Sequence, residues 1–198
     1  MKSIVKITLS ALGLAVLGPV AVLGFQDVER GGGPRNTFTI DVAVDCRTLV
    51  GGPNRGDTFI INGKIFPGGT LSSGVASNDP AQPVNGIAPV GDWLVRGHHA
   101  LPLPQSVAVW YRLAPGDFAT QYYMFHNART ALTAEGYAFL QGPTPTEALF
   151  SVTGGLGGFR GAAGEIQGTI LGTNSTGCPN SRVKVILVPG SVRGASRE

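Results

Sequence analysis

The sequence predicts an all-β domain of antiparallel strands. Residues 37–46 alternate polar and apolar side chains with a period of two, which puts the apolar ones on a single buried face. Similar β-rich runs follow, separated by turns rich in Gly, Pro, Asn and Asp, and no crossover helix is evident. Many short strands with such turns favour either a sandwich or a closed barrel.

The first 24 residues have the composition of a secretory signal peptide. A short basic start precedes an uncharged stretch at 7–26 that is rich in Leu, Val and Ala, with a small-residue cleavage site ending at Gly24. An uncleaved membrane anchor is the alternative, because the stretch approaches the roughly 20 apolar residues that span a bilayer. Two glycines and a proline weaken such a helix. We expect cleavage, a secreted or periplasmic protein, and no stable membrane insertion afterwards.

The rest of the chain divides into a flexible segment at 25–36, one β domain at 37–190 and a flexible tail at 191–198. The expected strands, eight or nine in number, are 37–46, 58–66, 92–99, 106–113, 118–125, 131–140, 148–153, 164–172 and 182–188. Residues 117–135 contain no Gly or Pro and could form a helix. Their aromatic and β-branched content and the polar segment 126–129 favour two strands joined by a turn.

Charge and motifs exclude several classes of function. Only 14% of residues are charged, and 15 Lys and Arg against 12 Asp and Glu are too slight an excess for a nucleic-acid partner. The glycines of 154–161 fit no dinucleotide-binding register, and no P-loop or nucleophile elbow is present. His98 and His99 are neighbours on an expected strand, so they point to opposite faces and cannot clamp one metal. His126 adds a third imidazole at an unknown distance. We therefore expect no metal and no cofactor.

Two cysteines, Cys46 and Cys178, are the only ones in the chain. Export would place them in an oxidising compartment, where a disulfide can persist. Neither belongs to a C-x-x-C pair, and no metal-ligand spacing accompanies them. A structural bridge and two inert buried thiols are both consistent with this pattern.

The segment Thr153 to Gly164 reads TGGLGGFRGAAG. It resembles the T-G-G-x-G-x-F-x-G-A-x-G signature of the allene oxide cyclase and dirigent barrel superfamily. Glycines permit a tight hairpin, and Phe159 can close one end of a barrel. Weaker similarities to secreted bacterial members follow in the expected order at 56–60, 63–67, 91–93, 96–97, 120–123 and 135–136.

The resemblance implies an eight-stranded antiparallel β-barrel that encloses an apolar pocket for a small apolar or oxygenated ligand. Members often form trimers, so it also implies a homotrimer. Cyclases and dirigent proteins work mainly by confinement, so any enzymatic activity would be isomerase- or cyclase-like and free of cofactors. The motif ends in Ala162-Ala163-Gly164, where plant dirigent proteins commonly carry A-R-G. The resemblance therefore does not imply the radical-coupling activity of the plant proteins. A non-catalytic carrier and a structural or interaction protein with a filled barrel are the alternatives.

Candidate site residues are polar or aromatic side chains on otherwise apolar strands. The expected catalytic residues are Arg96, Tyr123 and Glu135, and the expected ligand-binding residues are Trp93, Gln121, Tyr137 and Phe139. If Arg96 and Glu135 face inward, they could bind or polarise an oxygenated ligand. The alternative for both is a structural salt bridge or a solvent-facing charge. In a closed barrel the first and last strands are neighbours, so the barrel predicts a Cys46–Cys178 bond.

Overall fold

The computed structural model describes residues 36–52, 54–99, 118–126, 130–137 and 147–192. Nearly all of its regular structure is extended. The strands are β1 (Asn36–Gly51), β2 (Thr58–Pro67), β3 (Gly74–Val75), β4 (Gly91–His98), β5 (Phe118–Phe125), β6 (Thr130–Tyr137), β7 (Glu147–Leu156), β8 (Gly164–Thr173) and β9 (Pro179–Leu187). A single 3-10 turn, η1 (Gly157–Phe159), follows β7. Within these described ranges, no helix is long and apolar enough to cross a membrane.

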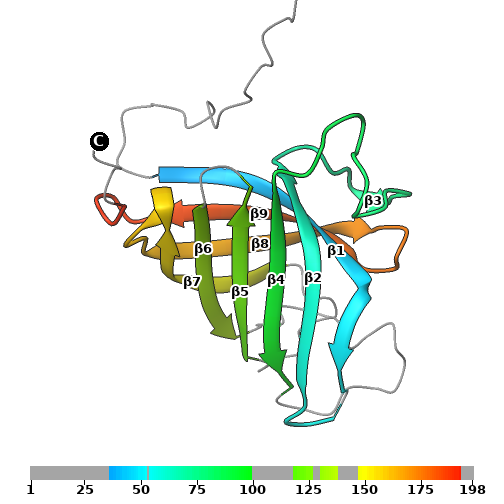
Figure 1. The fold of residues 1–198 in the computed structure, drawn as a ribbon, viewed down its shortest axis with the longest axis horizontal. Coiled ribbons are helices and arrows are strands. Elements are labelled where there is room, and N and C mark those ends of the chain that lie inside the picture. The colour runs from blue at the N-terminus through cyan, green and yellow to red at the C-terminus, as the bar shows by residue number, and fades with distance from the viewer. Residues whose placement is uncertain (1–35, 53, 100–117, 127–129, 138–146, 193–198) are drawn as a thin grey trace, which may run out of the picture.

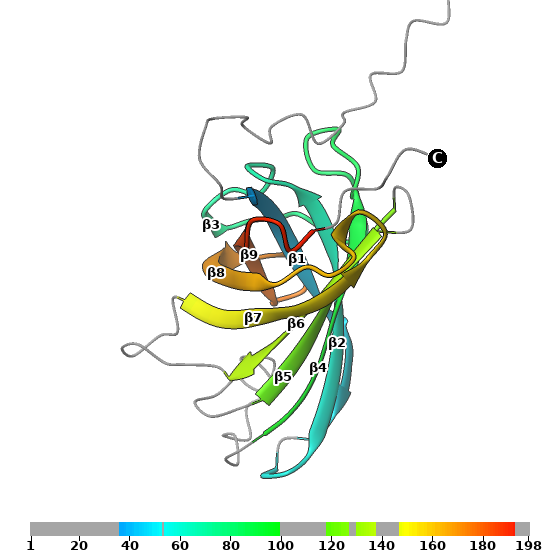
Figure 2. The same cartoon turned by 90° about the vertical axis from the view of Figure 1, so that its left-hand side faces the viewer.

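Eight of the strands close into a barrel (Figures 1 and 2). The hydrogen-bonded order is β8-β7-β6-β5-β4-β2-β1-β9, and β9 pairs again with β8, so the sheet has no free edge along this ring. All of these pairings are antiparallel. The closure decides between the two architectures left open by the strand pattern, and the predicted barrel is confirmed.

Most expected strands are present, with some differences in their ends. The segment 117–135 forms the two strands β5 and β6, as predicted, and not a helix. β1 continues five residues beyond Cys46, because a register shift between Asp45 and Val50 bends it without ending its pairing with β2. The expected strand 106–113 and the leader segment 1–24 lie outside the described residues. β3 was not predicted, since two residues carry no periodic pattern.

The main hydrophobic core lies inside the barrel. Alternate residues of each strand point inward, among them Ile40, Val42 and Val44 of β1, each at most 5% exposed. One end is closed by three phenylalanines: the ring of Phe159 stacks on Phe38 at 5.5 Å between centroids and tilts against Phe125 at 5.7 Å. Phe159 therefore closes a barrel end, as its place in the glycine motif predicted.

A second, smaller core lies on the outside of the barrel, where the connection between β2 and β4 covers β1 and β9. Ala43, Phe66 and Leu71 are buried there. The carboxylate of Asp41, fully buried, accepts a hydrogen bond from the Leu71 backbone N–H at 2.8 Å and two from Arg182. These contacts hold the connection against the barrel wall.

The glycine motif forms the end of β7, the turn η1 and the start of β8. A Cβ at Gly155 would lie 2.5 Å from the Phe159 carbonyl oxygen and 2.7 Å from that of Ala131. A Cβ at Gly164 would lie 2.1 Å from the carbonyl oxygen of Ile186. At both positions the backbones approach too closely for a side chain, which explains the glycines at Gly155 and Gly164.

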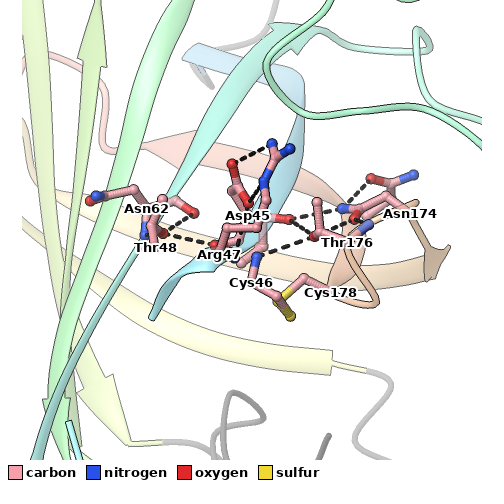
Figure 3. The surroundings of a disulfide bond; sticks show 10 residues. Asp45, Cys46, Arg47, Thr48, Asn62, Asn174, Thr176 and Cys178 are labelled. Carbon is pink, nitrogen blue, oxygen red and sulfur yellow. Dashed lines mark hydrogen bonds and ion pairs between the residues drawn. A yellow bond between two sulfur atoms is a disulfide. The ribbon is translucent and has the colours of Figure 1, made fainter. Parts of the chain in front are cut away.

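A disulfide joins Cys46 of β1 to Cys178, the residue before β9 (Figure 3). Their Cα atoms lie 5.3 Å apart, within the usual range for a bridged pair. The bond predicted from barrel closure is confirmed. Beside it, the Thr176 hydroxyl accepts a hydrogen bond from the Cys46 backbone N–H at 3.2 Å. The turn between β8 and β9 is thus attached to β1 by covalent and polar contacts.

Candidate functional site

Three uncharged polar side chains of β4 and β5 meet inside the barrel. Trp93 of β4 is paired across the strands with Tyr123 of β5, and Gln121 lies two residues before Tyr123, on the same face. The Trp93 indole donates a hydrogen bond from Nε1 to Gln121 Oε1 at 3.1 Å. The Tyr123 hydroxyl donates to the same oxygen. We call these three residues the interior trio.

The amide nitrogen of Gln121 is the polar group of the trio that remains available. Gln121 is only 7% exposed, and no residue in the described ranges accepts a hydrogen bond from its Nε2. Beyond Gln121, away from the phenylalanine end, the inward positions of β5 and β6 carry small residues: Ala119, Ala134 and Gly136. The N–H groups of this amide can donate to an acceptor on a bound molecule.

The polar side chains of the interior trio carry no charge. Burial raises the pKa of Tyr123 far above its ordinary value, and the neighbouring Trp93 lowers it by less, so the phenol keeps its proton. Among the described residues of the barrel strands, no Asp, Glu, Lys or Arg side chain lies on the inner face. The trio can therefore hold and orient a neutral molecule by hydrogen bonding, whereas it offers no ionised group for acid–base work.

Arg96 and Glu135 do not face the interior, so the inward orientation expected for them is wrong. Arg96 is exposed, and the strand alternation places it outside with His98 while Val95 and Gly97 point inward. The register aligns Arg96 with Thr120 and Thr120 with Glu135 on the outer face. Glu135 lies 3.4 Å from the Thr120 hydroxyl, and no ion pair joins it to Arg96 among the described residues. Strand alternation groups side chains by face but does not specify which face is inside, which explains the error.

Of the other expected site residues, some belong to the interior trio and the rest do not. Trp93, half-buried, and Gln121 belong to the interior trio, and Tyr123, expected to be catalytic, completes it. Tyr137 is the last residue of β6, with its backbone paired to Phe118, and Phe139 lies outside the described residues. The structure thus brings together three of the seven predicted site residues.

The histidines are separated. His98 is exposed, whereas His99 is 1% exposed and stacks on the ring of Phe59 at 4.7 Å, so the neighbours face opposite ways, as predicted. His126 is on the surface, where its Nε2 lies 2.9 Å from Asp92 Oδ2. Among the described residues, no group of three or more His, Cys, Asp or Glu could hold a metal ion.

A groove of about 390 Å³ lies across β1, β2, β4 and β5. Its lining combines polar side chains with Trp93 and Met124, and Asp92 in it pairs with both Lys64 and His126. Burial raises the pKa of Asp92, but the hydrogen bonds from Lys64 and His126 outweigh it, so the net pKa is lowered. Sequence reasoning missed this group, because only the register of β2 with β4 sets Lys64 opposite Asp92. Its charges satisfy one another, in contrast to the open amide of Gln121.

No protein-family model and no curated protein matches the sequence. Several solved structures are similar to this one. The pterocarpan synthase dirigent protein GePTS1 is 11% identical, covers 83% of this chain and 88% of its own, and has a TM-score of 0.53. The pterocarpan synthase dirigent protein PsPTS1 is 10% identical, with coverage of 81% and 97% and a TM-score of 0.53. A pyocyanin demethylase is 16% identical, with coverage of 77% and 99% and a TM-score of 0.47. The chain has the dirigent-type barrel fold.

Proposed function

We propose that this protein is an exported dirigent-like barrel that binds a small, uncharged, largely apolar molecule in its interior and steers its cyclisation or coupling. The observation that carries the proposal is the interior trio, in which the Gln121 amide oxygen accepts two hydrogen bonds while its amide nitrogen has no acceptor among the described residues.

Confinement is the mechanism that these residues support. The walls near Gln121 are apolar, and the trio supplies one oriented hydrogen-bonding point. A reactive molecule held in one conformation in a dry site gains orientation and is protected from water, and neither effect needs an ionised residue. The two dirigent proteins of the same fold are described as pterocarpan synthases. We propose that this chain acts in a similar way on a substrate that is not yet identified.

The test is native mass spectrometry of the protein purified from its own host. We expect a co-purifying small molecule on the wild-type protein and its loss from Gln121→Leu, because the apolar side chain removes the polar contact. Gln167→Leu is the matched control, since Gln167 of β8 is hydrogen bonded to Glu165 on the outer surface. Retention of the molecule by Gln121→Leu would place binding elsewhere. A wild-type protein that carries no small molecule, and is not stabilised by neutral aromatic compounds, would contradict ligand binding.

Export is the second part of the proposal. The basic and apolar character of residues 1–24 supports it, and so does the Cys46–Cys178 disulfide, which persists in an oxidising compartment. We expect the protein outside the cytoplasm to begin at residue 25. The intact mass of protein collected there checks this directly. A mass that includes Met1, or retention in the membrane fraction, would contradict cleavage.

A further inference from the structure

We propose that Gln121 anchors the ligand through a neutral oxygen acceptor of the carbonyl class, to which its amide Nε2 donates. This inference rests on the proposed function and gives the chemical class of the molecule bound. It follows from the geometry of the interior trio, which fixes which end of the amide faces its neighbours and which end faces the ligand.

The orientation of the Gln121 amide is set by Trp93. An indole N–H is a donor and never an acceptor, so the atom facing Trp93 Nε1 at 3.1 Å must be the amide oxygen. The Tyr123 hydroxyl approaches the same atom, which uses the second lone pair of that oxygen. Both acceptor sites of Oε1 are therefore filled by the protein. The Nε2 group, with its two N–H bonds, points away from them.

The exposed end of the amide selects the ligand. A group that only donates requires an acceptor, so the carbonyl oxygen of a ketone or an ester fits. A carboxylate fits poorly, because the described inner face carries no Lys or Arg to compensate its charge and burying an unpaired charge is expensive. A cation fits poorly as well, because the amide presents its positive end. The matching ligand is a neutral molecule with an oxygen acceptor at the edge of an apolar body.

One fixed hydrogen bond and apolar walls are enough to orient such a molecule. The half-buried Trp93 and the buried Val95 and Ala134 lie on neighbouring strands around Gln121. Sites of this kind use a few polar groups to set orientation and apolar surface to supply affinity. The position of the oxygen atom would then determine which part of the ligand is held near Tyr123.

The experiment compares two rigid probes that differ in one oxygen, 1-indanone and indane, on the full-length mature protein. Isothermal titration gives the affinities, and infrared spectroscopy gives the carbonyl stretching frequency of bound indanone. We expect wild type to bind indanone about tenfold more tightly than indane, the effect of one satisfied hydrogen bond. We also expect a lower stretching frequency than in an apolar solvent.

Gln121→Met keeps the approximate shape and removes the donor. It should bind indane as wild type does, lose the preference for indanone and leave the carbonyl frequency unshifted. Gln167→Met on the outer surface is the control and should retain the preference. Trp93→Phe removes the donor that orients the amide, so it should weaken the preference for indanone and improve binding of 1-indanol, which can donate. Circular dichroism verifies that each variant is folded.

The outcomes separate this inference from the proposed function. Equal binding of indanone and indane by wild type, or an unshifted carbonyl frequency, would overturn the carbonyl assignment and leave an apolar binding barrel. A preference that persists in Gln121→Met would overturn the role of Gln121. Binding of neither probe by wild type would count against both the carbonyl assignment and the binding function.

Discussion

Arg182 of β9 donates two hydrogen bonds to the carboxylate of Asp41 on the neighbouring strand β1, at 2.9 and 3.2 Å. The Asp41 side chain is fully buried, whereas that of Arg182 is 39% exposed. Arg182 also donates to the carbonyl oxygen of Leu71 at 3.1 Å. The Asp41–Arg182 pair therefore joins β1 and β9, where the barrel closes, and also holds the segment that links β2 to β4.

Asp41→Asn should destabilise the protein by about 2 to 4 kcal/mol. The change leaves the Arg182 guanidinium without its carboxylate at a partly buried site, and the partial exposure of Arg182 keeps the loss below that of a fully buried pair. Urea unfolding measures the effect. Glu165→Gln, at an exposed position of β8, is the control and should change stability by less than about 0.5 kcal/mol. Equal stability of Asp41→Asn and wild type would show that the pair contributes nothing.

Removing the disulfide should lower stability by roughly 4 to 5 kcal/mol, because it closes a loop of 132 residues in the unfolded chain. The variant is the double substitution Cys46→Ser with Cys178→Ser, compared with wild type under oxidising conditions. Urea unfolding measures the difference. Thiol titration of denatured, unreduced wild type should find no free thiol, and two free thiols would contradict the bond.

The protein should lose stability above about pH 10 through Tyr123. Burial raises the pKa of this phenol above its ordinary value of 10.0. Above pH 10 the unfolded chain releases the proton while the folded protein keeps it, so unfolding becomes more favourable as pH rises. The free energy of unfolding, measured from pH 8 to about 11, should therefore fall more steeply with pH for wild type than for Tyr123→Phe. Tyr122→Phe, on the exposed outer face, is the control and should keep the wild-type slope.

The sequon Asn174-Ser175-Thr176 should not carry a glycan in the folded protein. Asn174 is 5% exposed, its Nδ2 donates to the Val44 carbonyl oxygen at 2.8 Å, and its Oδ1 accepts two hydrogen bonds from Thr176. Figure 3 shows Asn174 and Thr176 beside the disulfide. Expressed in a glycosylating host, the secreted protein should show no mobility change on treatment with a peptide-N-glycosidase.

The same contacts predict a cost for Asn174→Ala. The change leaves the carbonyl oxygen of Val44 and the polar atoms of Thr176 short of partners, so we expect a loss of about 1 to 3 kcal/mol in urea unfolding. Ser175→Ala, at an exposed position of the same turn, is the control and should have a smaller effect. A folded protein with a glycan at Asn174 would contradict the buried placement.

Local pattern was enough to predict much of the fold. The period-two alternation of residues 37–46 defined the inner face of β1, because successive side chains on a strand point to opposite sides. The glycine motif at 153–164 predicted the dirigent-type barrel through its resemblance to the signature of that superfamily, and in the structure Gly155 and Gly164 lie where backbones approach too closely for a Cβ. The alternation also placed Gln121 and Tyr123 together on one face of β5.

Only the tertiary structure decided which face was inside and which residues met across strands. Arg96 and Glu135 looked like pocket residues in the sequence, yet register and burial place both on the outer face. The pairing of Asp41 with Arg182 joins residues 141 positions apart, and it depends on the closure of β1 against β9. The hydrogen bond from Trp93 to the amide of Gln121 likewise depends on the register that sets Trp93 opposite Tyr123. Strand alternation is a local property of the backbone, whereas register, closure and burial depend on contacts between distant segments, which a periodic pattern cannot specify.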